Sequence, residues 1–234
     1  MRVSNSEIEI LAYKAATGIG LPAGLAEDAG TATVWLANFG FCGGAIACRA
    51  FDNLDTGRAG PLTVGNNESF LYPSLSGKMS SVFYAAPSVG DFLQTVSQVT
   101  VERLDEPLLL LGYLASLSWM LEASFSLRAV GPRGLSWQGW VYKDHGKIEG
   151  ECFEDACEET GTQVTVESPA RILDDGNAKL AQHVIRKRQI TTRECLEITL
   201  GTFKTLQSLA AQTLVPETEV SRHKGAGAGL IDTD

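Results

Sequence analysis

The sequence predicts an α+β fold: a helical N-terminal region packed on a mixed, largely antiparallel sheet with interspersed helices, followed by a long C-terminal amphipathic helix. Three observations support this. Apolar residues recur every three or four positions in the first quarter of the chain. From about residue 78, several segments alternate between apolar and polar residues, with helical runs between them. Helical periodicity returns before Pro216.

The N-terminal region predicts three helices. Ser6 can cap the first helix while Glu9, three residues on, reaches back to it. Pro22 suits the first turn of the second helix, which Gly40 closes. A third, shorter helix is expected over about residues 45–54, and the many alanines of this region favour close helix packing.

A turn-rich connection is expected over residues 56–77, with room for a short strand. Alternation of period two then predicts strands in "SSVFYAA", "QVTVERL" and "EASFSLRAV". In the last of these, Phe125 and Leu127 belong to one face and Ser126 and Arg128 to the other.

Two helices are predicted between these strands, in "PSVGDFLQTVSQ" and "DEPLLLLGYLASLSWML". Asp105 is the expected cap of the second, with Pro107 in its first turn. The tripeptide Asp144-His145-Gly146 has the composition of a hairpin turn, and "TQVTVES" predicts a further strand.

Residues 179–190 fit either a helix or a strand, and both readings stay open. Thr191 with Glu194 predicts the start of the C-terminal amphipathic helix, which Pro216 ends. We expect a single domain over residues 1–234, comprising the helical region 1–55, a mixed core 78–215 and a glycine-rich segment 216–234.

The composition limits the kinds of partner that the protein is expected to bind. The 234 residues are 44% hydrophobic and 20% charged, as in ordinary globular domains. A net charge of −9 argues against nucleic acid, whose phosphates are neutralised by Lys and Arg. The basic run 186–188 is read as a solvated edge.

The predicted location in the cell rests on the lack of a secretory leader pattern and of a membrane-spanning run in the sequence. Glu7 and Glu9 interrupt any secretory leader, and the uncharged run 107–121 is shorter than the roughly 20 residues that a membrane span needs. The five cysteines, an odd number, read as reduced thiols. These features predict a cytoplasmic protein without a membrane partner.

The sequence contains no motif for metal binding by cysteine or histidine and none for a nucleophilic serine. No C-x-x-C pair exists, the three histidines stand outside metal-binding patterns, and "GLSWQG" lacks the spacing of a nucleophile elbow. No metal is therefore predicted, and the cofactor is left unknown. The acidic run Glu149–Glu159 reads as a solvated face, with paired carboxylates or a cation site as the open alternative.

The C-terminal segment "SRHKGAGAGLIDTD" is the predicted ligand site. Alternating glycines let backbone N–H groups turn toward an anion, which Arg222 would anchor, and the two aspartates would meet a positive group. The candidate residues are Glu219, Ser221, Arg222, Gly225, Gly227, Gly229, Asp232 and Asp234. A frayed, exposed end is the alternative.

Three stretches resemble a bacterial family of uncharacterised proteins, domain-of-unknown-function family 3726. They are "VPETEVSRHKGAGAGLIDTD", "SNSEIEILAYKAATGIGLPAGLAEDAG" and "APSVGDFL" with "LDEPLLLLGYLA". The resemblance implies one domain over nearly the whole chain and makes the C-terminal motif its most specific part. It implies no activity.

Two hypotheses about function follow. The first is a protein that binds a small anionic metabolite through its C-terminal segment, with or without catalysis. The second is a non-catalytic accessory subunit whose C-terminal segment docks on a partner or on a second copy, as a homo-oligomer. The sequence leaves open whether the protein is an enzyme.

Overall fold

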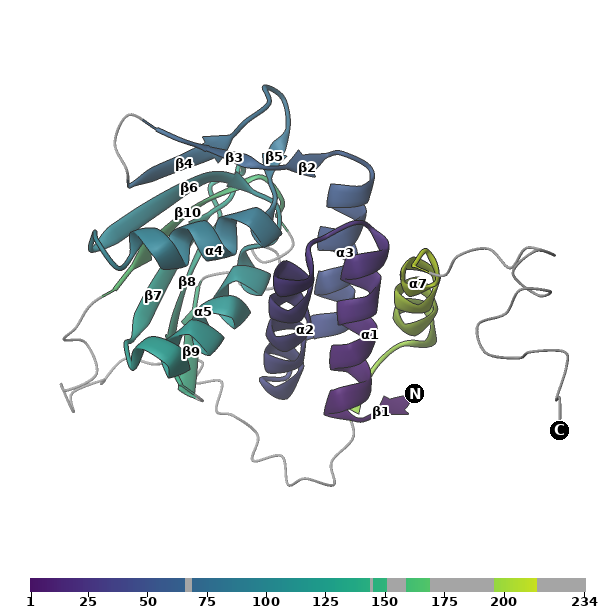
Figure 1. The fold of residues 1–234 in the computed structure, drawn as a ribbon. Coiled ribbons are helices and arrows are strands. Elements are labelled where there is room, and N and C mark those ends of the chain that lie inside the picture. The colour runs from purple at the N-terminus through teal and green to yellow at the C-terminus, as the bar shows by residue number, and fades with distance from the viewer. Residues whose placement is uncertain (66–68, 144, 151–158, 169–195, 214–234) are drawn as a thin grey trace, which may run out of the picture.

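The fold is that of a computed structural model, and it confirms the α+β class. A sheet carries α4 and α5 on one face, and α1, α2, α3 and α7 lie beside that unit (Figure 1). The structure describes residues 1–65, 69–143, 145–150, 159–168 and 196–213.

The described helices follow the predicted order. Their bounds are Asn5–Gly18 (α1), Ala23–Asn38 (α2), Gly43–Asp55 (α3), Val82–Phe92 (α4), Pro107–Leu121 (α5) and Leu200–Ala211 (α7).

The main sheet has the strand order β2-β5-β6-β10-β7-β8-β9, and a β3–β4 hairpin joins it through β4 and β6. The pairs β2–β5, β5–β6 and β4–β6 are parallel and the other pairs are antiparallel, so the sheet is mixed as predicted. The strands are Ala59–Gly60 (β2), Leu62–Val64 (β3), Phe70–Pro73 (β4), Met79–Ser80 (β5), Gln98–Leu104 (β6), Phe125–Val130 (β7), Ser136–Tyr142 (β8), His145–Glu149 (β9) and Thr162–Glu167 (β10).

The first helix begins two residues earlier than the sequence predicts. Ser4 is the N-cap: its hydroxyl accepts from the Glu7 N–H, and the Glu7 carboxylate accepts from the Ser4 N–H. The predicted pair, Ser6 and Glu9, has the same spacing but lies inside the helix. Two S-x-x-E boxes overlap here, and the one that also buries Ile8 is used.

Small residues bring the helices close together. A Cβ at Gly30 of α2 would lie 2.9 Å from the Glu9 carbonyl oxygen of α1, and one at Gly112 of α5 would lie 2.8 Å from the Ala32 carbonyl oxygen of α2. Backbones approach this closely only where a side chain is absent. The predicted close packing of the N-terminal helices is confirmed, and it extends to α5.

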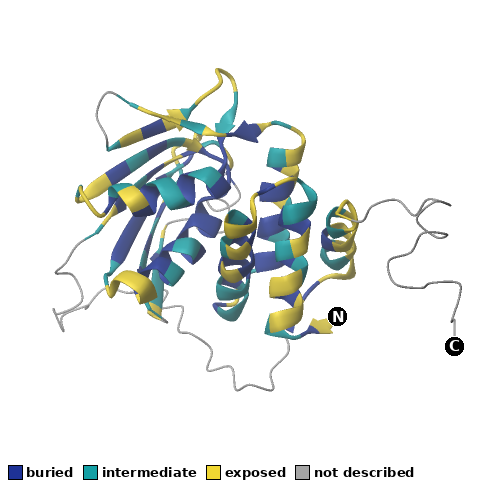
Figure 2. Cartoon of the chain, in the orientation of Figure 1, coloured by how far each residue is buried: buried dark blue, intermediate teal, exposed yellow. Residues whose placement is uncertain are grey.

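The two faces of the sheet differ. Val101, Val164 and Leu127 are buried on the face that α4 and α5 cover. The residues that alternate with them, such as Thr165 and Arg128, are half-buried or exposed. Over β7 the predicted pattern of the segment 122–130 holds for the buried Phe125, Leu127 and Ala129 and the exposed Arg128, whereas Ser126 is buried as well. Figure 2 shows the change of exposure along the strands.

Two element predictions are wrong. "SSVFYAA" is the start of α4 and no strand, because Ser81 takes the N-cap position and the Asp105 carboxylate accepts from the Val82 N–H. Apolar residues on both faces mark a buried helix here. Leu196 and Glu197 form strand β11 (Leu196–Glu197), so the C-terminal helix begins only after its N-cap, Thr199.

A clasp joins the first and the last described residues. Strand β1 (Arg2–Val3) pairs antiparallel with β11, and α7 packs on α1 and α3 with Leu206 fully buried. A Cβ at Gly18 would lie 2.0 Å from the Leu209 carbonyl oxygen, so α1 and α7 touch backbone to backbone. The clasp lies beside the other helices, away from the sheet (Figure 1).

Candidate functional site

The predicted C-terminal site lies outside the described residues. This applies to every candidate in it: Glu219, Ser221, Arg222, Gly225, Gly227, Gly229, Asp232 and Asp234. Residues 179–190 and most of the acidic run 149–159 lie outside as well. The two ends of that run are described, and each is an ion-pair partner: Glu149 of Lys147, and Glu159 of Arg133.

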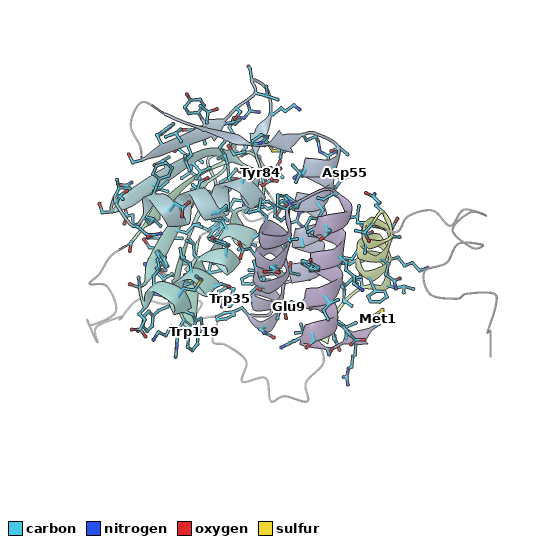
Figure 3. All side chains as sticks on the ribbon, in the orientation of Figure 1. Met1, Glu9, Trp35, Asp55, Tyr84 and Trp119 are labelled. Carbon is cyan, nitrogen blue, oxygen red and sulfur yellow. The ribbon has the colours of Figure 1, made fainter. Side chains whose placement is uncertain are left out.

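A different polar group lies where the helices meet the sheet unit, and we call it the seam cluster. It comprises Arg49 and Asn53 on α3, Ser81 before α4, and Asp105 and Glu106 between β6 and α5. All but Arg49 are buried polar residues in an otherwise apolar interior. Figure 3 labels Asp55 and Tyr84, which belong to the end of α3 and the first turn of α4 beside this seam.

An ion pair spans the seam. Arg49 Nε lies 2.7 Å from Glu106 Oε1, and its Nη2 lies 3.0 Å from Oε2, so the guanidinium grips both carboxylate oxygens. The Glu106 side chain is 2% exposed, whereas that of Arg49 is 43% exposed. Burial raises the pKa of Glu106, and the Arg49 hydrogen bond and charge oppose that rise.

Asp105 is the most perturbed of these groups. Its side chain is fully buried, and burial raises its pKa to about 8, although backbone N–H groups donate to it. Oδ1 accepts from the N–H of Val82 at 2.8 Å and of Glu106 at 2.9 Å. The carboxyl group is therefore protonated at neutral pH and can donate one hydrogen bond.

Three buried atoms of the seam cluster have no hydrogen-bond partner among the described residues. They are Asn53 Nδ2, Ser81 Oγ and Asp105 Oδ2. The orientation of the Asn53 amide follows from its oxygen, which accepts from Arg58 Nε at 3.0 Å. Asn53 Nδ2 is a donor, and the Ser81 hydroxyl and the protonated Asp105 carboxyl can donate as well, so all three atoms can donate to an acceptor of a ligand.

Backbone and side-chain hydrogen bonds connect the surroundings of these three atoms. Asp105 Oδ1 reaches the residue that follows Ser81, and the Ser81 N–H donates to the Gly60 carbonyl next to strand β2. Asn53 reaches the same edge through Arg58, whose carbonyl accepts from Met79. The positive ends of α4 and α5 both begin here, which favours an electronegative occupant.

Three surface depressions lie outside the seam cluster. A cleft between α2, α4 and α5 is lined mainly by apolar side chains, with Tyr113 and Asp28 as its polar members, and holds only about 10 Å³. A shallow groove between α1 and α2 carries Glu9 and Glu27, which would repel an anion. A hollow of about 410 Å³ beside Arg128 is described below.

Metal and thiol chemistry find little support in the part of the chain that the structure describes. No group of three or more His, Cys, Asp or Glu residues there is arranged to hold a metal ion. Cys42 and Cys48 are free thiols, and burial raises the pKa of Cys48 to about 11, which makes it a poor nucleophile.

Sequence reasoning missed the seam cluster. Asp105 was predicted as the cap of α5, but its carboxylate caps α4 instead. Two signals were present: adjacent acids between a strand and an apolar helix, and Arg49 with Asn53 one helical turn apart on an apolar helix. Neither signal shows its partner, because the two segments are more than fifty residues apart.

Comparison with known proteins defines the fold class first. The structure is similar to a dehydrogenase from Sinorhizobium meliloti, with 13% identity, 90% of this chain and 99% of that chain covered, and a TM-score of 0.55. A sulfolactate dehydrogenase from Methanocaldococcus jannaschii is similar with 8% identity, 91% of this chain and 97% of that chain covered, and a TM-score of 0.58. A malate dehydrogenase from Entamoeba histolytica is similar with 7% identity, 93% of this chain and 99% of that chain covered, and a TM-score of 0.57. At these identities the likeness shows a shared fold.

A family model matches the N-terminal part of the sequence. It belongs to a family described as protein of unknown function (DUF3726) and matches residues 3–55, which hold α1, α2 and α3. Over that part the match supports the resemblance to this family. No curated protein matches the sequence.

The expectation about membranes has one test in the described residues. None of the helices there is long and apolar enough to cross a bilayer.

Proposed function

We propose that the protein binds a small anionic metabolite, a carboxylate, at the seam cluster. The observation that carries the proposal is the set of three buried polar atoms that can donate and have no partner among the residues that the structure describes. A buried polar group left unsatisfied costs about 1–3 kcal/mol, so three at one seam need a partner. A carboxylate offers two oxygens, and each oxygen accepts more than one hydrogen bond.

The charge of the seam suits such a ligand. Glu106 is matched by Arg49, and Asp105 is neutral below about pH 8. The exposed part of the Arg49 side chain and the N-termini of α4 and α5 then leave a positive potential. Within the seam cluster, an incoming anion therefore meets no uncompensated carboxylate below about pH 8.

The fold likeness supports the size and class of the ligand. The structures that share this fold over nine-tenths of the chain or more include dehydrogenases named for malate and sulfolactate, both small carboxylates. We therefore choose malate as the first probe. The proposal concerns binding, and turnover is a separate question.

Thermal unfolding with and without malate tests the proposal. Malate should raise the Tm of the wild-type protein at pH 7, and Ser81→Ala should reduce that rise, because it removes one donor. Ser88→Ala is the matched control: its hydroxyl bonds within α4 to the Tyr84 carbonyl, so the malate effect should be unchanged.

The state of Asp105 supplies a second test. Above pH 8 the wild-type carboxyl loses the proton that makes it a donor, so malate binding should weaken. Asp105→Asn keeps a donor and an acceptor at all pH values, and its binding should persist to pH 9. An equal malate effect in the wild-type, Ser81→Ala and Asp105→Asn proteins at both pH values would show that malate does not bind at the seam.

The C-terminal segment remains a further proposal, on sequence grounds alone. If it contributes an anion anchor, Arg222→Ala should remove ligand-induced stabilisation. If it docks on a partner or a second copy, deletion of residues 222–234 should instead change the elution volume in size-exclusion chromatography.

A further inference from the structure

Arg128 is a charged residue in the middle of the sheet. It lies on β7 between β10 and β8, directly opposite Thr165 on one side and Gln138 on the other. It belongs to the face that α4 and α5 do not cover, and its side chain is exposed. Its direct cross-strand neighbours are thus neutral and polar.

The Arg128 guanidinium has no ion pair and no hydrogen bond within the part of the chain that the structure describes. Other charges of this face are engaged: Glu102 accepts from the Gln163 amide, and Lys147 pairs with Glu149. Glu167 is a diagonal neighbour, at about 7–8 Å by sheet geometry. Arg128 alone therefore combines a full positive charge with free donors.

A hollow of about 410 Å³ opens beside this side chain. Besides Arg128, its lining includes Gln138, Ser136 and Glu149 as polar groups and Leu135 and Trp137 as apolar ones. The hollow has the volume of a small-molecule site. A forked guanidinium next to an amide and a hydroxyl matches the geometry of a carboxylate.

Charge separates the candidate anions. Glu149 stands two strands from Arg128, roughly 10 Å away, and is balanced by Lys147. Glu167 is exposed on the other side. One available positive charge between carboxylates favours a monoanion over a phosphate dianion, and the apolar lining favours a short hydrocarbon part.

We propose that the hollow beside Arg128 is a second ligand site, which binds a small monocarboxylate. The guanidinium grips the carboxylate, the Gln138 amide and the Ser136 hydroxyl complete its hydrogen bonds, and Leu135 contacts the apolar part. The site lies on the face of the sheet opposite α4 and α5, so it does not depend on the seam cluster.

Titration of the full chain with propionate, followed in ¹H–¹⁵N spectra, tests this site. The backbone and side-chain amides of Gln138 and the backbone amide of Ser136 should shift in a saturable way. Arg128→Gln should weaken the apparent affinity at least about tenfold. Arg128→Lys should lose less, because it keeps the charge without the fork. Lys204→Gln, with the same charge change on exposed α7, is the matched control and should have no effect.

Two further arms keep the result specific. Phosphate should shift the same amides less than propionate at equal concentration, and Ser81→Ala should leave the propionate response intact, which separates this site from the seam. Absent shifts in the wild-type protein, an unchanged response in Arg128→Gln, or a stronger response to phosphate would each overturn the proposal.

Discussion

Removal of Arg49 is the sharpest test of how the seam is held together. Loss of one partner of a buried ion pair costs about 3–5 kcal/mol, because a carboxylate is left in a low dielectric. Glu106 is 2% exposed, but the Arg49 side chain is 43% exposed, and water screens part of the interaction. We therefore expect Arg49→Met to lower the free energy of unfolding by about 2–3 kcal/mol at pH 8.

The loss should depend on pH in a defined direction. Without Arg49, the groups that lower the pKa of Glu106 are gone and burial raises it further. The folded protein then holds a proton that the unfolded chain releases above about pH 4.3. The variant should accordingly lose stability as the pH rises from about 4 toward neutrality, and should approach the wild type at pH 4.

Urea unfolding followed by tryptophan fluorescence at pH 4 and pH 8 measures the effect. Arg49→Met/Glu106→Gln should recover part of the loss at pH 8, because no charge remains buried. Arg2→Met is the control: Arg2 and Glu197 form a pair whose side chains are both largely exposed, so its loss should be close to zero. A loss in Arg49→Met that is equal at both pH values would refute the reasoning.

The remaining predictions concern Asp105 and the α1–α7 contact. The folded-state pKa of Asp105 is raised to about 8, so its contribution should lower wild-type stability from about pH 4 to pH 8 and then level off. Urea titrations across that range should show that this contribution is absent from Asp105→Asn. Gly18→Ala drives a Cβ into the Leu209 carbonyl and should cost about 1–3 kcal/mol, with faster proteolysis after α3. Gly24→Ala, which meets nothing within 4 Å, should be neutral or slightly stabilising by the same assays.

Local sequence patterns predicted most of the fold because the spacing of apolar residues along the chain differs between helices and strands. The alternation in 122–130 predicted β7, and the expected hairpin is present as the antiparallel pair β8 and β9. Its turn was misplaced, because His145 and Gly146 lie in β9, opposite Tyr142 and Val141. "SSVFYAA" failed because the residue that fixes its helical start, Asp105, is more than twenty positions away. Local composition holds no record of such a cap.

The seam cluster was beyond prediction for the same reason. The sequence pattern presents Asp105 as a helix cap and does not single out Glu106 or Arg49. These residues form a cluster only when α3 packs beside the start of α5. That packing pairs Glu106 with Arg49 next to Asp105, whose Oδ2 has no partner among the described residues. The C-terminal segment, which sequence reasoning favoured, remains a prediction.

The clasp of β1, β11 and α7 also has a consequence for synthesis on the ribosome. The surface of α1 that packs against α7 is made early and is covered only after α7 has been translated. Until then the nascent helices carry an open apolar strip, so slow elongation late in the message would prolong exposure to chaperones and to aggregation. The protein's yield in cells should respond to codon choice near its end more than near its beginning.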